Sequence, residues 1–120
     1  MNMQLTTSDL GDLTASIDGN FDAKSCAEHK NQFENICHSA ASKLVIVNMQ
    51  QVDFLDASGV GALVFMFKRI KSVGGRLILV GAKQQPRDLL TMLRVNHIIT
   101  MMDTLPRQTQ HVDSLTSIAA

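Results

Sequence analysis

The chain has few of the residues that mark special environments. Among its 120 residues there is no Trp or Tyr, and aromatic residues make up only 4%, so the stacking platforms used by single-stranded nucleic acid are scarce. Lys+Arg and Asp+Glu number 11 each, which leaves no net charge to favour a polyanion. No apolar run approaches the roughly 18 residues of a membrane span. We therefore expect neither nucleic acid nor membrane as a partner.

Cysteine is scarce as well. Cys26 and Cys37 fall in one predicted helix, in which their separation corresponds to about 16 Å, too far for a disulfide. The histidines show no ligand spacing with them, so we expect no metal and no cofactor. The N-terminus lacks the pattern of a signal peptide. We expect a single cytoplasmic domain over residues 1–120, with a core from about 3 to 115.

Apolar periodicity predicts alternating strands and helices. Residues 3–7 and 12–17 alternate apolar and polar side chains around a turn, which indicates a hairpin that ends near Gly19. The predicted elements that follow are a helix from Asp22, a strand over Leu44–Val47, a helix over Val60–Val73, a strand over Arg76–Gly81, a helix over Gln84–Val95, a strand over His97–Met102 and a helix from Thr104. Such alternation gives parallel strands joined by crossovers. We predict an α/β fold: a small mixed sheet of four to five strands, an opening hairpin and then parallel strands, with about four packed helices.

The same periodicity assigns core-facing side chains in three helices. In the first they are Ala23, Cys26, Ala27, Phe33, Ile36, Cys37 and Ala40. In the second they are Val60, Leu63, Val64, Phe67 and Ile70, with Met66 and Val73 at the margin. In the third they are Leu89, Leu90, Met92 and Leu93.

The most informative segment runs from Gln51 to Val64. It places Ser58 where a strand gives way to a helix, with Asp53 and Asp56 just before it. Backbone N–H groups are unpaired at such a junction, and the helix dipole is positive there. A serine in this place can cap the helix, a role open equally to Asp56; it can be a nucleophile; or it can accept a phosphoryl group.

The nucleophile interpretation has little support from the flanking residues. A hydrolase elbow requires glycine two residues before and after the serine, whereas Asp56 and Val60 stand there. Gly59 and Gly61 also fit a dinucleotide motif poorly, because Val64 replaces its third glycine. A phosphoserine, by contrast, adds about −1.5 to −2 charges at a place where the dipole tolerates them.

The helix after Ser58 has a second face opposite its core side. At helical spacing, Ser58, Ala62, Phe65 and Arg69 form one stripe, with Gly61 and Ser72 beside it. Phe65 is a large apolar group on a face that should be exposed. It marks either a docking surface or a second buried layer under the final helix.

These segments resemble the STAS domain, and specifically the stand-alone anti-sigma factor antagonists. Gly19–Asp22 resembles their G-R-L-D segment, and Leu44–Gly61 resembles their strand followed by D-S-S-G-L-G. Gly74–Gly81 resembles the next strand, and Leu89–Ile98 a later helical segment. The resemblance covers residues 3–115. Three substitutions depart from the family pattern: Ala57 replaces the first hydroxyl, Asn20 replaces Arg, and Val95-Asn96 replaces Gly-Leu.

The resemblance implies a binding module, not an enzyme. Ser58 would be phosphorylated by a Bergerat-type serine kinase that is also the anti-sigma factor, and a metal-dependent serine phosphatase would reverse this. The stripe and the resemblance together predict a partner-binding surface that comprises Asp22, Asp56, Ala57, Gly59, Gly61, Ala62, Phe65 and Arg69. Asp22 could instead cap the first helix, which we favour because a helical pattern follows it directly.

Two alternatives stay open. The chain could be a STAS accessory subunit of an ABC-type lipid or solute transporter, which is also a binding role. It could also be a serine hydrolase with Ser58 as its nucleophile, although the flanking residues speak against this.

Overall fold

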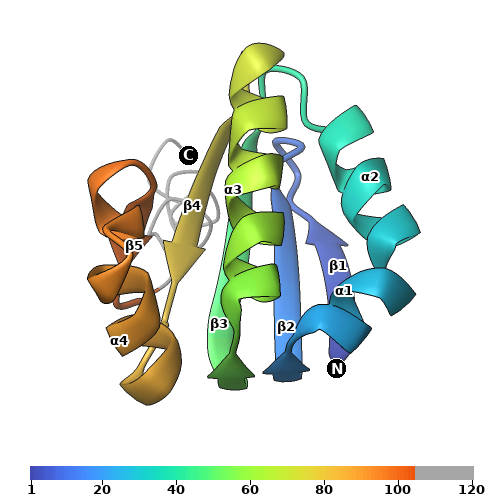
Figure 1. Ribbon diagram of the computed structural model, residues 1–120. Helices are drawn as coiled ribbons and strands as arrows, with labels where there is room; N and C mark the ends of the chain where they lie inside the picture. Colours follow the sequence, from blue (N-terminus) through green and yellow to red (C-terminus); the bar gives the residue numbers. More distant parts are fainter. Residues whose placement is uncertain (105–120) are drawn as a thin grey trace.

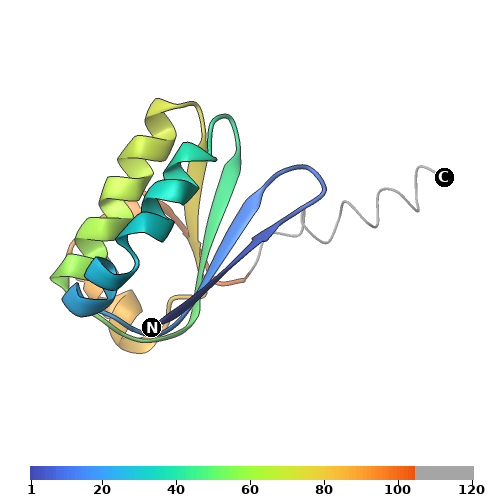
Figure 2. The same ribbon diagram turned by 90° about the vertical axis from the view of Figure 1, so that its right-hand side faces the viewer.

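The computed structural model describes residues 1–104, which form one five-stranded sheet with helices on one of its faces (Figures 1 and 2). The strands lie in chain order: β1 (Asn2–Thr7), β2 (Leu13–Phe21), β3 (Leu44–Leu55), β4 (Arg76–Val80) and β5 (Thr100–Met102). β1 pairs with β2 antiparallel, and the other neighbours are parallel. The predicted α/β class, with its opening hairpin and parallel strands, is confirmed.

The helices follow the strands as the alternation predicts. They are α1 (Ala23–Glu28), α2 (Lys30–His38), α3 (Ala57–Ser72) and α4 (Gln84–Met92), and a short 3₁₀ turn, η1, spans Val95–His97. Figure 2 shows α1, α2 and α3 on the same face of the sheet. The helix predicted from Thr104 lies outside the described residues.

β3 is much longer than predicted. The strand continues from Val47 to Leu55, because Val52 and Leu55 also pack into the core. Its pairing with β2 contains two register shifts, and the buried residues in this part of the strand, Met49, Val52 and Leu55, recur at every third position instead of every second. β2 likewise runs beyond its predicted end at Gly19, which has φ of +99°, to Phe21.

The predicted first helix is two helices, α1 and α2, that meet at His29. Ala23 and Ala27 are exposed, so their assignment to the core is wrong, whereas Cys26 is partly buried and packs against the core. Ser25 is buried instead, and its hydroxyl donates to the carbonyl O of Asn20 at 2.9 Å. That bond satisfies the buried hydroxyl. Both cysteines are free, in agreement with the predicted lack of a disulfide.

The core face of α3 is centred slightly differently from the prediction. Its buried members are Gly59, Val60, Leu63, Met66 and Ile70. Val64 and Phe67 are only partly buried, and Val73 is exposed, so Met66 is a central core residue and not a marginal one. The helix ends before Gly74-Gly75, as predicted.

The third predicted helix also ends early. α4 stops at Met92, and Arg94 adopts a left-handed conformation with φ of +59° that starts η1. Met92 and Leu93 are therefore 74% and 50% exposed, against expectation, whereas Leu90 is buried and Leu89 partly so. β5 begins only at Thr100, since residues 95–97 form η1.

Candidate functional site

Two strand–helix junctions lie side by side at one end of the sheet. Phe21 and Leu55 are paired at the carboxyl ends of β2 and β3, and α1 and α3 begin directly after them (Figure 1). Parallel pairing thus brings together Asp22 and Asp56, which are far apart in the sequence. Both predicted acidic site residues stand at the starts of helices.

Asp56 caps α3 and also reaches the neighbouring helix. One carboxylate oxygen, Oδ1, accepts from the backbone N–H of Gly59 at 2.9 Å. The other, Oδ2, accepts from the backbone N–H of Ala23 at 3.1 Å. Of the two cap candidates in the sequence, the structure therefore selects Asp56 rather than Ser58.

Because Asp56 supplies the cap, Ser58 has no capping role in residues 1–104. It is the second residue of α3 and is exposed, as are Ala57 before it and Gly61 after it. No hydrogen bond to its hydroxyl occurs within this range. An exposed, unpartnered hydroxyl in the first turn of a helix is chemically available to another protein.

Gly59 and Gly61 differ sharply in their surroundings. Gly59 is buried, and a Cβ added to it would lie 2.5 Å from the carbonyl O of Phe21 and 2.6 Å from Cδ1 of Leu55. A Cβ at Gly61 would meet nothing within 4 Å. Gly59 is thus required by the close approach of α3 to the end of β2, whereas Gly61 leaves an open place on the exposed surface.

Asp22 is the N-cap of α1, as favoured above. Its Oδ1 accepts from the backbone N–H of Ser25 at 2.9 Å, and this bond is the main cause that lowers the pKa of the Asp22 carboxyl. The pKa of the Cys26 thiol is raised by burial first and then by the charges of Asp56 and Asp22. The thiol is thus held in the less reactive protonated form. Whether Asp22 also contacts a partner stays a prediction.

The predicted stripe on α3 is an exposed face. Phe65 is 52% exposed, and Ala62 and Arg69 are partly exposed. The guanidinium carbon of Arg69 stands 5.4 Å from the centroid of the Phe65 ring, a cation–π arrangement. Within the part of the chain that the structure describes, Phe65 is thus exposed, and its role in docking stays a prediction. We call Ser58, Gly61, Ala62, Phe65 and Arg69 the α3 stripe.

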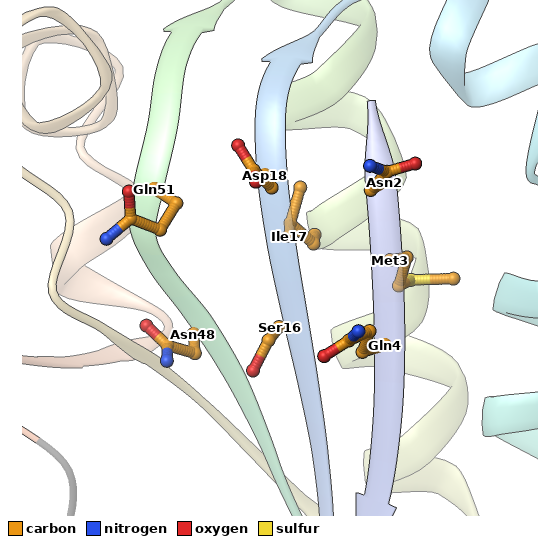
Figure 3. Close-up of a pocket in the computed structure, with 8 residues that line it drawn as sticks. All are labelled: Asn2, Met3, Gln4, Ser16, Ile17, Asp18, Asn48 and Gln51. Carbon is orange, nitrogen blue, oxygen red and sulfur yellow. The ribbon is translucent and has the colours of Figure 1, made fainter.

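The opposite face of the sheet carries a hollow that the sequence did not reveal. It measures about 470 Å³, and its polar lining residues are Asn2, Gln4, Ser16, Asp18, Asn48 and Gln51 (Figure 3). They come from β1, β2 and β3, so no local pattern brings them together. The lining includes one carboxylate and no Lys or Arg, which does not suit an anion.

Other kinds of site are missing from the part of the chain that the structure describes. No group of three or more His, Cys, Asp or Glu residues there could hold a metal ion. No described helix is long and apolar enough to cross a membrane. Nor does any described histidine bond to Ser58; Nδ1 of His29 lies instead 3.0 Å from the carbonyl O of Ser25.

The STAS domain family model matches residues 3–107. This chain belongs to the STAS domain family. An anti-sigma factor antagonist from Mycobacterium paratuberculosis has the same fold, with a TM-score of 0.78 at 15% identity over 99% of this STAS domain and 94% of that chain. The anti-sigma factor antagonist SpoIIAA in its unphosphorylated form gives a TM-score of 0.68 at 19% identity, over 96% of this chain and 98% of that chain.

Two further structures share this fold. The Bacillus cell fate determinant SpoIIAA in the phosphorylated form gives a TM-score of 0.69 at 18% identity, covering 95% of this STAS domain and 99% of that chain. A sulfate transporter family protein from Wolinella succinogenes gives a TM-score of 0.66 at 16% identity, over 87% of this chain and 86% of that chain. At these identities the likeness shows the fold, and both functional classes use it.

Phe65 and Met66 offer a matched pair of substitutions on α3. Phe65→Ala should weaken partner binding with little loss of stability, since the side chain is half exposed. Met66→Ala should cost about 3 kcal/mol of stability, because that side chain is 1% exposed in the core. Phe67, the core residue expected from the sequence, is only partly buried and is the poorer control. Urea unfolding measures the stability of each variant, and binding titrations measure its affinity for the partner. Loss of stability in Phe65→Ala with unchanged binding would mean that the α3 stripe is not the docking face.

Proposed function

We propose that this STAS domain is a phosphorylation-controlled binding module of the anti-sigma factor antagonist kind in a bacterial partner-switching system. The unphosphorylated form binds a Bergerat-type serine kinase that doubles as an anti-sigma-type regulator. Phosphorylation of Ser58 releases it, and a metal-dependent serine phosphatase restores it. The domain is a substrate and not an enzyme, and it works in the cytoplasm. The exposed Ser58 hydroxyl in the first turn of α3, with the cap supplied by Asp56, is the observation that carries the proposal.

The position of Ser58 suits a phosphate that is added and later removed. Near the start of α3, free N–H groups and the helix dipole tolerate a phosphate, so the fold should survive its addition. The same charge on the α3 stripe would oppose docking, because an interface formed with neutral Ser58 would have to bury it. The switch then acts at the interface and needs no change of fold.

A relative with the same fold supports this assignment. SpoIIAA is known in an unphosphorylated and a phosphorylated form, so the fold persists in both states in that protein. In this chain, the hydroxyl of Ser58 and the absence of one at Ala57 leave a single candidate beside Gly59.

The second candidate is an accessory STAS subunit of an ABC-type lipid or solute transporter. The similarity to a sulfate transporter family protein favours some transport role. Pull-down with mass spectrometry separates the two candidates, because one predicts a kinase and a phosphatase and the other a transporter ATPase. Failure of a fluorophosphonate probe to label Ser58 would remove the serine hydrolase.

Ser58→Ala should abolish phosphorylation of this protein. Purified Bergerat-type serine kinases from the source organism, each incubated with ATP and the wild-type domain, should place one phosphate on the peptide that contains Ser58. Ser72→Ala is the control, since Ser72 is an exposed serine near the other end of α3 whose hydroxyl donates to the carbonyl of Arg69. If Ser58→Ala is phosphorylated as well as the wild type, the assignment of Ser58 is wrong.

A further inference from the structure

We infer that Asp56 is a positioning residue for the Ser58 switch, because its carboxylate holds α1 and α3 together as one docking surface. The inference rests on the proposed function. It assigns a role to one contact, the hydrogen bond from the Ala23 backbone N–H to Asp56 Oδ2, which we call the Asp56–Ala23 brace.

The brace is separate from the capping of either helix. The cap of α3 uses the other oxygen, Oδ1, which accepts from Gly59 N–H. The cap of α1 is Asp22, which accepts from Ser25 N–H. The N–H of Ala23 is one of the groups that a helix leaves unpaired at its start, and here its acceptor is a side chain 33 residues away. Each helix would therefore keep its cap if the brace were absent.

The rest of the junction shows why this bond controls relative position. Gly59 packs so closely on the Phe21 carbonyl that α3 is fixed against the end of β2. The backbone N–H of Asp56 also donates to that carbonyl, at 3.3 Å. Directly after Phe21 the chain turns into α1, a helix of only six residues, so the brace ties its first residue to the fixed part.

The consequence concerns the surface that a kinase must recognise. Exposed positions of α1, including Lys24 and Ala27, lie on the helix beside the one that presents Ser58 and Gly61. A kinase that contacts both α1 and α3 binds best when the two helices already have the spacing of the bound state. Otherwise binding must order the helices, which costs free energy. Loss of the brace should thus weaken docking and leave the chemistry at the Ser58 hydroxyl unchanged.

Two substitutions remove the brace from opposite sides. Asp56→Ser keeps a residue able to cap α3 but is too short to reach Ala23. Ala23→Pro removes the donor N–H; proline is well tolerated at the first helical position, and Asp22, with φ of −123° and ψ of −177°, has the extended backbone that must precede it. Asp53→Ser is the control, since it also removes one carboxylate, but at an exposed position of β3 that takes no part in the brace.

The experiment measures phosphorylation kinetics with the purified kinase and ATP, together with amide exchange by NMR. We expect both variants to raise KM for the domain roughly tenfold, with kcat within about twofold of wild type, as loss of one charge-assisted hydrogen bond from a docking surface implies. The double variant should be no worse than either single one, since both remove the same bond. Exchange at Ala23 should accelerate in Asp56→Ser, while Gly59 stays protected.

The outcomes separate the brace from the proposed function. A wild-type domain that no such kinase phosphorylates would overturn the proposed function and this inference with it. A phosphorylated wild type with an unchanged KM in Ala23→Pro would overturn the brace alone. So would an effect confined to Asp56→Ser, because the carboxylate would then act by some other contact. Thermal midpoints near wild type in both single variants verify that folding is intact.

Discussion

Ser58→Asp should leave the protein folded and weaken its binding to the kinase by about 3 kcal/mol, or roughly a hundredfold. Aspartate places a fixed negative charge in the first turn of α3, on the exposed side of the helix. An interface formed with a neutral hydroxyl has no partner for that charge. Burial of an unmatched charge or its placement against an acidic surface costs several kcal/mol.

The fold should tolerate the same charge. Acidic residues in the first turn of a helix interact favourably with the dipole, by about 0.3–1 kcal/mol. The hydroxyl of Ser58 makes no hydrogen bond in the described range, so its replacement removes none from the domain. The thermal midpoint of Ser58→Asp should therefore lie near that of the wild type.

Calorimetric titration against the kinase, with thermal unfolding of each variant, measures both effects. Ser58→Asn is the matched control, since it has nearly the same size and shape as aspartate but no charge. It should bind far better than Ser58→Asp. Equal losses in the two variants would show that size and not charge disrupts docking, and normal binding of Ser58→Asp would contradict the proposed switch.

Gly59→Ala should destabilise the domain by about 3 kcal/mol, whereas Gly61→Ala should stabilise it by up to about 1 kcal/mol. A methyl group at Gly59 meets a backbone carbonyl and a buried leucine, neither of which can move freely, and such overpacking costs about 1–3 kcal/mol or more. At Gly61 the methyl group meets nothing within 4 Å, so the higher helix propensity of alanine should make this substitution stabilising.

Urea unfolding of the two variants tests this contrast on one helix with one chemical change. Partner binding adds a second measurement for Gly61→Ala, which should bind less well despite its greater stability if the partner approaches the α3 stripe closely. Destabilisation of Gly61→Ala would mean that the first turns of α3 pack differently from the structure described above.

Some features of the fold and of the site could be predicted from residue patterns alone. The apolar run after Gly74-Gly75 predicted β4, and the spacing of Val60, Leu63 and Ile70 predicted the buried side of α3. The same spacing placed Ser58 and Phe65 on the opposite, exposed side. These predictions succeeded because each depends on a period within one continuous segment, and that period is set by backbone geometry.

Other features depended on contacts between segments. The break at His29, where φ is −108° and ψ is 13°, could not be predicted, because no Gly or Pro marks it in the sequence. Nor could the full length of β3, since register shifts against β2 reset the alternation of its side chains. In both places the local pattern allowed a simpler continuation than the one the chain adopts.

By itself, the sequence determined that a serine and two acids stand near a strand–helix junction, beside an exposed stripe with a phenylalanine. Only the tertiary structure decided which group caps α3 and which is left free. Asp56 takes the cap through Oδ1, which accepts from Gly59, and its other oxygen accepts from Ala23, which comes within reach only when β2 and β3 lie parallel side by side. Strand pairing, which no local pattern around Ser58 encodes, therefore brings α1 beside the helix that presents Ser58.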